Sequence, residues 1–408
     1  MNIIDVINKK RLGKELTYKE LDYAFNGYLN HIHEDYQMSS LLMAIVINGM
    51  SLEETINLTD IFIKSGEILD LHSVSNVIID KHSTGGVGDS TTLVVGPIVA
   101  ACGCYMVKIS GRGLGITGGT IDKLESIPGF NVNLKKSEFK RTLKKVGFVD
   151  SAQTKNLVPL DKIVYNLRNN SGTTESLPLI ASSIMSKKIA SGADIILIDI
   201  KVGKGALIKT KKDANELSNW MKSIGKKYNK KVVTIISDMN IPLSNSIGNR
   251  LEVEEAIRVL KGAKTRLYDV SKEIASILIS LAKKITIKEA EEKVDEVIKN
   301  GKAFEKFNEF VTSQGGNIKK LNIDAKVKII RSEKNGILKN IDALKIGELS
   351  LKLGAGKIND RESIDYSAGI RLYKEINDTI KKGDILATLY TNKKIKLSSD
   401  DINCFIIE

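Results

Sequence analysis

The sequence predicts an α/β fold joined to a helical domain, and three observations point to it. Between residues 75 and 240, short apolar runs alternate with helical patterns, as in a parallel sheet covered by helices. Residues 1–66 show helical spacing alone, and after about residue 325 the pattern changes to short strands and glycine-rich turns. Hydrophobic residues make up 42% of the 408 positions, which is enough for two or three domains with cores of their own.

The N-terminal segment is predicted to be a set of helices. Residues 17–20 (TYKE) and 51–54 (SLEE) match the capping box, in which a hydroxyl and a carboxylate satisfy the first amides of a helix. Leu41, Leu42, Ala44, Ile45 and Ile47 predict a mostly apolar helix that is buried between partners.

A strand–loop–helix–strand–loop unit follows. Residues 77–79 and 105–109 predict buried strands, and residues 91–101 between them predict a buried helix. Residues 195–198 and 232–236 predict two more strands of the same parallel sheet.

Three parts make up the predicted chain, and catalysis would require closure of the first two across a cleft. They are a helical domain of residues 1–66 and 160–190, a larger α/β domain of residues 67–159 and 191–325 with a mostly parallel central sheet, and a small α+β C-terminal lobe of residues 326–408.

The chain carries 62 Lys and Arg against 49 Asp and Glu, a formal charge of +13. Such a balance suits a nucleic-acid binder. The basic residues are mostly Lys and are spread along the whole chain, so we expect no nucleic-acid partner. A positive surplus still attracts an anionic substrate.

The cysteines and histidines predict no metal centre. Cys102, Cys104 and Cys404 show no zinc spacing, and their odd number argues against a disulfide framework. His31 and His33 have no third ligand nearby and are more typical of surface polar groups. With no signal-peptide layout and no apolar run long enough to span a bilayer, a cytoplasmic protein without a membrane partner is expected.

The first chemical motif is the glycine-rich loop of residues 81–92, KHSTGGVGDSTT. Glycines let backbone amides converge on an anion, the following helix adds its dipole, and hydroxyl groups add donors. Lys81 supplies a full charge. The loop lacks the GxxxxGK(S/T) pattern of a Walker loop. A plain turn is the alternative, but the Lys, His and hydroxyl residues favour anion binding.

A second glycine-rich loop, residues 110–125, follows the next predicted strand. Both loops therefore lie at the carboxyl edge of the sheet, where open α/β sheets bind ligands. Two such loops can surround a tetrahedral oxyanion from two sides. Arg112, Lys123 and Glu125 are interpreted as a structural ion-pair set rather than as ligands.

Residues 110–125, SGRGLGITGGTIDKLE, match the pattern S-x-R-G-L-x-x-T-G-G-T-x-D-x-L-E, and the chain resembles the thymidine and pyrimidine-nucleoside phosphorylases. KHSTGGVGD at 81–89 is also typical of that family. The likeness continues through DYQMS at 35–39, IASSIMSKK at 180–188 and ISDM at 236–239. Residues 182–190 and Lys108 look more like the broad-specificity bacterial enzymes than the strict thymidine enzymes.

The resemblance implies phosphorolysis of uridine, deoxyuridine and thymidine, with inorganic phosphate as co-substrate and no organic cofactor. It implies phosphate contacts by Lys81, His82, Ser83, Thr92, Lys108, Ile109, Ser110 and Thr120. It implies pyrimidine contacts by Tyr165, Arg168, Ser183 and Lys187, with His82, Arg168 and Lys187 as the catalytic groups. It further implies a homodimer through the N-terminal helices, and a potassium ion held by Gly88, Ser90, Leu243, Ser246 and Glu255, whose hard oxygen ligands suit such a cation.

The implied chemistry agrees with these residue types. Displacement of the base by phosphate leaves negative charge on the pyrimidine, which Arg168 and Lys187 can offset. A preorganised donor of this kind contributes about 3–4 kcal/mol. His82 can donate a hydrogen bond or a proton to the base.

The chain departs from the family pattern at three places. Residues 169–173 are NNSGT where the family has D-x-T-A-T, so the acid beside Arg168 is missing. Ile116 replaces a usual His, and Lys204 stands where small residues are typical. The main phosphate and base contacts are kept, and an active enzyme is predicted.

Three other functions compete with this prediction. One is a strict thymidine phosphorylase. The second is an enzyme like the anthranilate phosphoribosyltransferases, which share the general fold but need a magnesium-pyrophosphate site, and whose loops the second motif does not fit. The third is a non-catalytic nucleic-acid-binding protein, whose binding would depend on salt.

Overall fold

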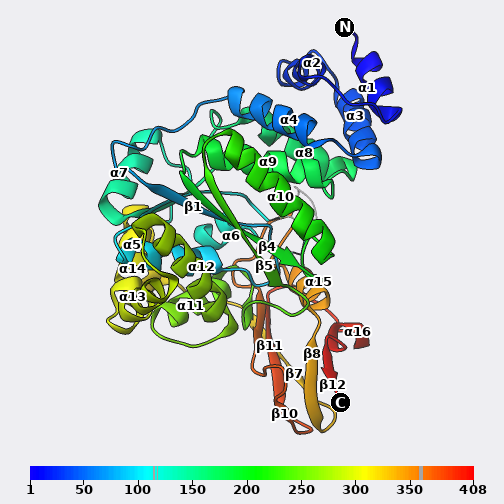
Figure 1. The fold of residues 1–408 in the computed structure, drawn as a ribbon. Helices are drawn as coiled ribbons and strands as arrows, with labels where there is room; N and C mark the ends of the chain where they lie inside the picture. Colours follow the sequence, from blue (N-terminus) through cyan, green and yellow to red (C-terminus); the bar gives the residue numbers. More distant parts are fainter. Residues whose placement is uncertain (114, 117, 358–361) are drawn as a thin grey trace. The chain divides into compact units, whose positions relative to one another are not determined.

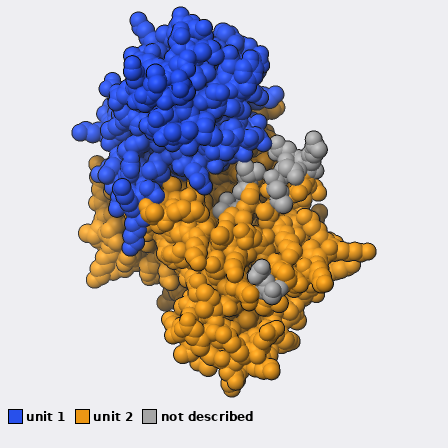
Figure 2. All heavy atoms as spheres, turned by 90° about the vertical axis from the view of Figure 1, so that its right-hand side faces the viewer, with its two compact units in different colours: residues 1–82, 153–196, 211–234 blue, residues 83–152, 197–210, 235–408 orange. Residues whose placement is uncertain are grey.

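The computed structural model describes residues 1–113, 115–116, 118–357 and 362–408 of the chain (Figure 1). Two compact units are distinguished by colour in Figure 2. Unit 1 comprises Met1–His82, Gln153–Ile196 and Lys211–Thr234, and unit 2 comprises Ser83–Ala152, Leu197–Thr210 and Ile235–Glu408.

Unit 1 is mainly helical. Its helices are α1 (Ile3–Arg11), α2 (Tyr18–Leu29), α3 (Asp35–Asn48), α4 (Leu52–Lys64), α8 (Pro159–Ser171), α9 (Leu177–Ala190) and α10 (Lys211–Lys227). Both predicted capping boxes are present, at the starts of α2 and α4. Helix α9 packs on α4 and α10, and α8 packs on α2 and α3, so the two predicted helical segments form one body.

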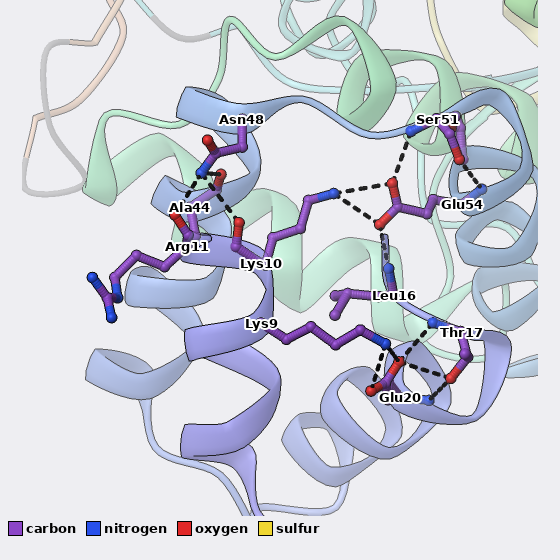
Figure 3. Close-up of polar contacts among 11 residues, drawn as sticks. Lys9, Lys10, Arg11, Leu16, Thr17, Glu20, Ala44, Asn48, Ser51 and Glu54 are labelled. Atoms are coloured by element: carbon purple, nitrogen blue, oxygen red, sulfur yellow. Dashed lines mark hydrogen bonds and ion pairs between the residues drawn. The ribbon is translucent and has the colours of Figure 1, made fainter. Parts of the chain in front are cut away.

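A buried ion pair joins α1 to α4 (Figure 3). The Lys10 ammonium lies 2.8 and 3.0 Å from the two carboxylate oxygens of Glu54. The same carboxylate accepts hydrogen bonds from the backbone N–H groups of Leu16 and Ser51. Asn48 donates to the carbonyl of Lys10 at 3.1 Å. Every charged atom of the pair is thus bonded, as a buried pair requires.

Two predictions for this unit are wrong. His33 is not a surface group, because its side chain is buried, its Nε2 lies 3.1 Å from the Tyr23 carbonyl oxygen, and its ring packs edge-on against Tyr23. Gly27 makes the room, since a Cβ there would lie 2.3 Å from the His33 ring. Ile47 is not buried with the rest of its helix and is 73% exposed.

The central sheet has the strand order β3-β2-β1-β4-β5. Its strands are β1 (Ile78–Ser83), β2 (Tyr105–Ser110), β3 (Phe148–Ala152), β4 (Ile195–Val202) and β5 (Lys231–Asp238). The four predicted strands are confirmed, and β3, which pairs parallel with β2, was not predicted. The chain order reverses between β1 and β4, so the carboxyl ends of these two strands form the topological switch point.

The helical part of unit 2 surrounds α5. The helices are α5 (Thr91–Ala101), α6 (Thr120–Glu125), α7 (Lys136–Val146), α11 (Asn249–Leu260), α12 (Arg266–Lys283), α13 (Ile287–Lys299) and α14 (Lys302–Ser313), with a 3₁₀ turn at Ile318–Lys320. Helix α5 is buried over almost all of its length, and α11 to α14 pack against it (Figure 1). The predicted helix at residues 91–101 is confirmed. None of the described helices combines the length and the apolar composition that a bilayer crossing requires.

The C-terminal part of unit 2 is built mainly from short antiparallel strands. They are β6 (Ser246–Ile247), β7 (Lys326–Arg331), β8 (Gly336–Ile341), β9 (Gly369–Leu372), β10 (Thr379–Ile380), β11 (Ile385–Thr391) and β12 (Phe405–Ile407), with helices α15 (Ala343–Leu353) and α16 (Ser399–Ile402). They form the sheets β6-β9-β11-β7 and β10-β8-β12. Val87 of the first loop belongs to their core, and Ile116 of the second loop packs against it. The C-terminal part therefore supports both glycine-rich loops.

Candidate active site

The first glycine-rich loop is organised around Asp89. The Asp89 carboxylate accepts hydrogen bonds from the hydroxyl of Ser83 and from both the N–H and the hydroxyl of Thr91, at the start of α5. Gly85 and Gly88 have φ of +92° and +72°, a conformation that glycine adopts without strain. The loop is thus shaped by its own side chains before any ligand binds.

The second loop is held in the same way. Ser110 donates to the carboxylate of Asp150 on β3 at 2.9 Å. A serine hydroxyl has one proton, and in both loops the serine directs that proton to an aspartate. An incoming phosphate must displace an aspartate from the hydroxyl or be held by amide and ammonium groups.

Arg112 and Glu125 form the predicted structural ion pair. Two guanidinium nitrogens of Arg112 lie 2.5 and 2.7 Å from the carboxylate oxygens of Glu125. This pairing lowers the pKa of Glu125 below its usual value. Lys123 does not join them; its ammonium pairs with Glu252 of α11 at 2.9 Å.

The switch point adds residues that the sequence did not single out. Thr84 donates its N–H to the Asp199 carbonyl at 3.1 Å, and its hydroxyl accepts from the Lys201 N–H at 2.9 Å. Gly86 forms an isolated bridge with Ala206, in the loop after β4. The carboxyl end of β4 is therefore attached to the first loop, a connection between segments more than 100 residues apart in the chain.

The remaining residues predicted to bind phosphate lie on the strands and helix starts that flank the loops. Lys81 and His82 lie on β1 just before its last residue, Lys108 and Ile109 lie on β2, Thr92 lies in the first turn of α5, and Thr120 begins α6. Lys81, Lys108, Ile109 and Thr92 are all buried. Their role in phosphate binding stays a prediction.

Helices α8 and α9 bring the predicted base-binding residues together. The Lys187 ammonium lies 2.5 Å from the Asp161 carboxylate and 2.7 Å from the Ser183 hydroxyl. Tyr165 is 45% exposed, and both Lys187 and Arg168 lie 5.9 Å from its ring centre. The four residues predicted to contact the pyrimidine thus form one cluster within unit 1.

Asp161 is a member of this cluster that was not predicted. Its carboxylate is buried. Asp161, Tyr165 and Arg168 follow a spacing of four and three residues, which places them on one face of α8. That spacing is the signal that could have identified it. Burial lowers the pKa of Lys187, and the Asp161 carboxylate opposes this by stabilising the charged ammonium.

Arg168 is buried and bonded to the backbone of the α8–α9 connection. Its guanidinium donates to the carbonyls of Thr173 at 3.1 Å, Thr174 at 2.8 Å and Leu179 at 3.2 Å. Gly172 makes this possible, because its left-handed backbone (φ +66°) ends α8 and turns the chain back. Backbone carbonyls therefore accept the hydrogen bonds of this guanidinium, and the residue that follows it in the chain is Asn169.

The two other departures have separate structural roles. Ile116 packs against the C-terminal core, and a Cβ on Gly347 of α15 would lie 3.0 Å from the Ile116 Cβ. An apolar side chain fits this surface better than an imidazole. Lys204 is exposed, and its ammonium lies 3.3 Å from the Asp342 carboxylate.

The residues predicted to hold potassium offer oxygen atoms in unit 2. Glu255 is buried, burial raises its pKa, and its Oε2 lies 3.6 Å from the Arg258 guanidinium but accepts no hydrogen bond from any described residue. The carbonyl of Gly88 accepts from Ser244 at 2.5 Å, and the Ser244 hydroxyl also lies 3.3 Å from that of Ser90. A buried, partly unsatisfied carboxylate beside loop oxygens fits a monovalent cation.

Comparison with known families gives three matches along the chain. They are the Glycosyl transferase family, helical bundle domain at residues 4–66, the Glycosyl transferase family, a/b domain at residues 75–304, and the Pyrimidine nucleoside phosphorylase C-terminal domain at residues 337–400. The a/b domain carries both glycine-rich loops and the α8–α9 cluster.

Relatives of known activity match nearly the whole chain. Pyrimidine-nucleoside phosphorylases from Bacillus subtilis (strain 168), Staphylococcus epidermidis (strain ATCC 12228 / FDA PCI 1200) and Geobacillus stearothermophilus are 46%, 44% and 42% identical over 402 residues, covering 97% of this chain and 93% of each relative. The crystal structure of anthranilate phosphoribosyltransferase from Thermus thermophilus has a TM-score of 0.62 at 16% identity, and the match covers 76% of this chain and 99% of that one. That likeness shows the fold alone.

The helical bundle and the a/b domain define a glycosyl transferase of this fold. The C-terminal domain and the near-complete match to the three bacterial enzymes narrow the class, and the chain belongs to the pyrimidine-nucleoside phosphorylase family. The resemblance seen in the two loop motifs and the predicted fold class are both confirmed.

Proposed function

We propose that this protein is a pentosyltransferase that catalyses the reversible phosphorolysis of uridine, deoxyuridine and thymidine to the free base and (deoxy)ribose 1-phosphate. The observation that carries the proposal is the 46% identity to a pyrimidine-nucleoside phosphorylase over 97% of the chain. The two glycine-rich loops and the α8–α9 cluster lie within that match. Inorganic phosphate is the co-substrate, and no organic cofactor is required by the reaction.

Phosphate would bind at the two glycine-rich loops of the α/β domain. The first turn of α5 supplies amide N–H groups and the positive end of a helix dipole. Lys81 and Lys108, both buried, supply charge on β1 and β2. Ser83, Thr92, Ser110 and Thr120 supply hydroxyl groups. A buried phosphate oxygen bound in this way is held rigidly for attack on C1′ of the sugar.

The pyrimidine would bind at the α8–α9 cluster. As the bond from C1′ to the base breaks, negative charge grows on the base. The Lys187 ammonium can offset that charge, and Asp161 favours the protonated form although burial lowers the pKa of Lys187. Arg168 and Ser183 offer further donors, the face of Tyr165 supports the ring, and His82 donates to a carbonyl of the base.

A potassium ion would bind beside the first loop. Glu255 would neutralise it with the oxygen that accepts no hydrogen bond from a described residue. Gly88, Ser90, Leu243 and Ser246 would complete the oxygen shell. The ion would stabilise the loop that precedes α5.

A homodimer through the N-terminal helices is supported by an exposed apolar stripe on α3. Tyr36, Met43 and Ile47 are 70%, 37% and 73% exposed. With Ser40 they are spaced by four, three and four residues, so they share one face of the helix. An apolar face of this kind is typical of a contact between subunits.

A substrate panel tests the proposal directly. Release of base from uridine, deoxyuridine, thymidine and cytidine is measured with and without phosphate. We expect phosphate-dependent release from the first three. Release from thymidine and deoxyuridine alone would identify a strict thymidine phosphorylase, and no release above background from any nucleoside would refute the proposal.

A further inference from the structure

Lys123 is among the largest fully buried side chains of the protein, and it lies between the two glycine-rich loops. Its ammonium donates to the Asp89 carbonyl at 2.6 Å and lies 3.5 Å from the Gly118 carbonyl oxygen. The carboxylate of Glu252 lies 2.9 Å away on a third side. An ammonium group has three protons, and protein oxygens surround this one, with the shortest contact to the Asp89 carbonyl.

The two carbonyls belong to different loops. Asp89 lies in the first loop, immediately before Ser90, the N-cap residue of α5. Gly118 lies in the second loop, two residues before Thr120 begins α6. Because a peptide group is planar, a carbonyl that is held in place fixes the orientation of its whole peptide unit. One ammonium therefore fixes one peptide plane in each loop.

Glu252 anchors this ammonium to the scaffold. It lies in α11, it is buried, and its other oxygen accepts the N–H of Gly248 at 3.1 Å. The neighbouring Asn249 donates to the carbonyl of Ala355, in the C-terminal part of unit 2. The start of α11 is thus bonded to the C-terminal part of unit 2, and α11 itself packs on α5 and α6.

We propose that Lys123 is a positioning residue for phosphate, because its buried ammonium holds both glycine-rich loops in the arrangement that binds the anion. This inference rests on the proposed function and adds a residue that does not touch substrate. Its loss weakens phosphate binding, while the affinity for nucleoside and the turnover at saturating phosphate change much less.

Three variants separate positioning from plain stability. Lys123→Met removes both loop contacts and leaves the Glu252 charge buried without a partner, which destabilises the fold. Glu252→Gln removes the anchor charge but keeps the contacts of Lys123 with Asp89 and Gly118. The double variant Lys123→Met/Glu252→Gln removes both charges, so stability returns in part, but the loop contacts stay absent.

Two quantities are measured for each variant: the dissociation constant of inorganic phosphate by titration calorimetry, and the midpoint of thermal unfolding. Steady-state kinetics also gives kcat and the KM values for phosphate and for uridine. We expect Lys123→Met and the double variant to raise the phosphate dissociation constant about tenfold or more, the effect of losing charge-assisted hydrogen bonds. Of the three variants, Glu252→Gln should raise the phosphate dissociation constant least.

The Lys10–Glu54 pair provides a matched control. Its side chains are 3% and 2% exposed, against 2% and 3% for Lys123 and Glu252. Lys10→Met should lower the unfolding midpoint as Lys123→Met does and leave the phosphate dissociation constant unchanged.

The proposal is overturned if the double variant regains phosphate affinity together with stability, or if Lys10→Met weakens phosphate binding as much as Lys123→Met. A wild-type protein that binds phosphate but releases no base refutes the proposed function alone, and the titrations still decide the role of Lys123. A wild-type protein that binds no phosphate overturns both.

Discussion

The phosphate loops and the base-binding cluster use polar groups in opposite ways. In the loops, side chains such as Asp89, Asp150 and Lys123 bond to other protein groups and thereby shape the backbone. In the α8–α9 cluster, the helices fix the backbone, and the charged ends of Lys187 and Arg168 are held by Asp161 and by carbonyls. Under the proposed function, the first region would bind phosphate through its backbone conformation, and the second would act through the charge of individual side chains.

This difference implies different responses to substitution. Removal of a shaping residue in the loops should weaken phosphate binding through a shift in backbone. Removal of a charge in the cluster should slow the chemical step, because the group acts on charge that develops only in the transition state. The Lys123 variants test the loops, and four further substitutions test the cluster and its surroundings, from the largest expected effect to the smallest.

Lys187→Met should have the largest effect. Without the ammonium, the negative charge that grows on the departing base is no longer stabilised by Lys187. We therefore expect kcat to fall about a hundred- to a thousandfold. Steady-state phosphorolysis of uridine measures this, with Lys162→Met, an exposed lysine of α8, as the control. A fall in phosphate affinity with kcat unchanged would contradict the division between the two regions.

Asp161→Asn should have the next largest effect, and it should depend on pH. In the proposed mechanism Lys187 acts as an ammonium, so activity should be lost as pH rises through its pKa. Burial already lowers that pKa, and Asp161 opposes the shift. Loss of the carboxylate lowers the pKa further, so the alkaline loss of kcat moves to lower pH.

At neutral pH we expect kcat of Asp161→Asn to fall about ten- to a hundredfold, the effect of losing a charged hydrogen bond. The kcat–pH profiles of the variant and the wild type check the direction. An alkaline limb that stays in place, or that moves to higher pH, would show that Asp161 does not sustain the charge on Lys187.

Gly172→Ala tests whether the turn after α8 positions Arg168. Its φ of +66° is strained for alanine, and we expect a loss of about 1–2 kcal/mol in the free energy of unfolding. The carbonyls that accept from Arg168 should move, raising KM for uridine. Gly301→Ala is the matched control, with φ of +83° and open space around its Cβ position. A rise in KM for both variants, or for neither, would contradict the link to Arg168.

Lys204→Ala should have the smallest effect. The Lys204 end of the pair with Asp342 is 61% exposed although Asp342 is buried, and a pair whose cation lies in solvent contributes about 1 kcal/mol or less. Chemical unfolding and the KM values for phosphate and uridine should match those of the wild type within error. A clear change in KM would give Lys204 a part in the site that its contacts do not indicate.

Much of the fold could be predicted because its signals are local. The helix at residues 91–101 and the capping boxes of α2 and α4 depend on neighbours within a few residues. Burial was harder, as His33 and Ile47 show. The residue pattern of a helix shows which of its positions are apolar. It does not show which face of the helix another element covers.

The sequence by itself determined the class of the molecule: the two glycine-rich loops, the strands that precede them, and the helices that carry Arg168 and Lys187. Only the tertiary structure decided the partners of the charged groups. Lys123 meets Glu252 rather than Glu125, Lys187 meets Asp161, and Arg168 meets backbone carbonyls. The physical reason is that hydrogen bonds and ion pairs act over a few ångströms in space, and chain folding brings Lys123 to Glu252 and Lys187 to Asp161, which lie far apart in the sequence.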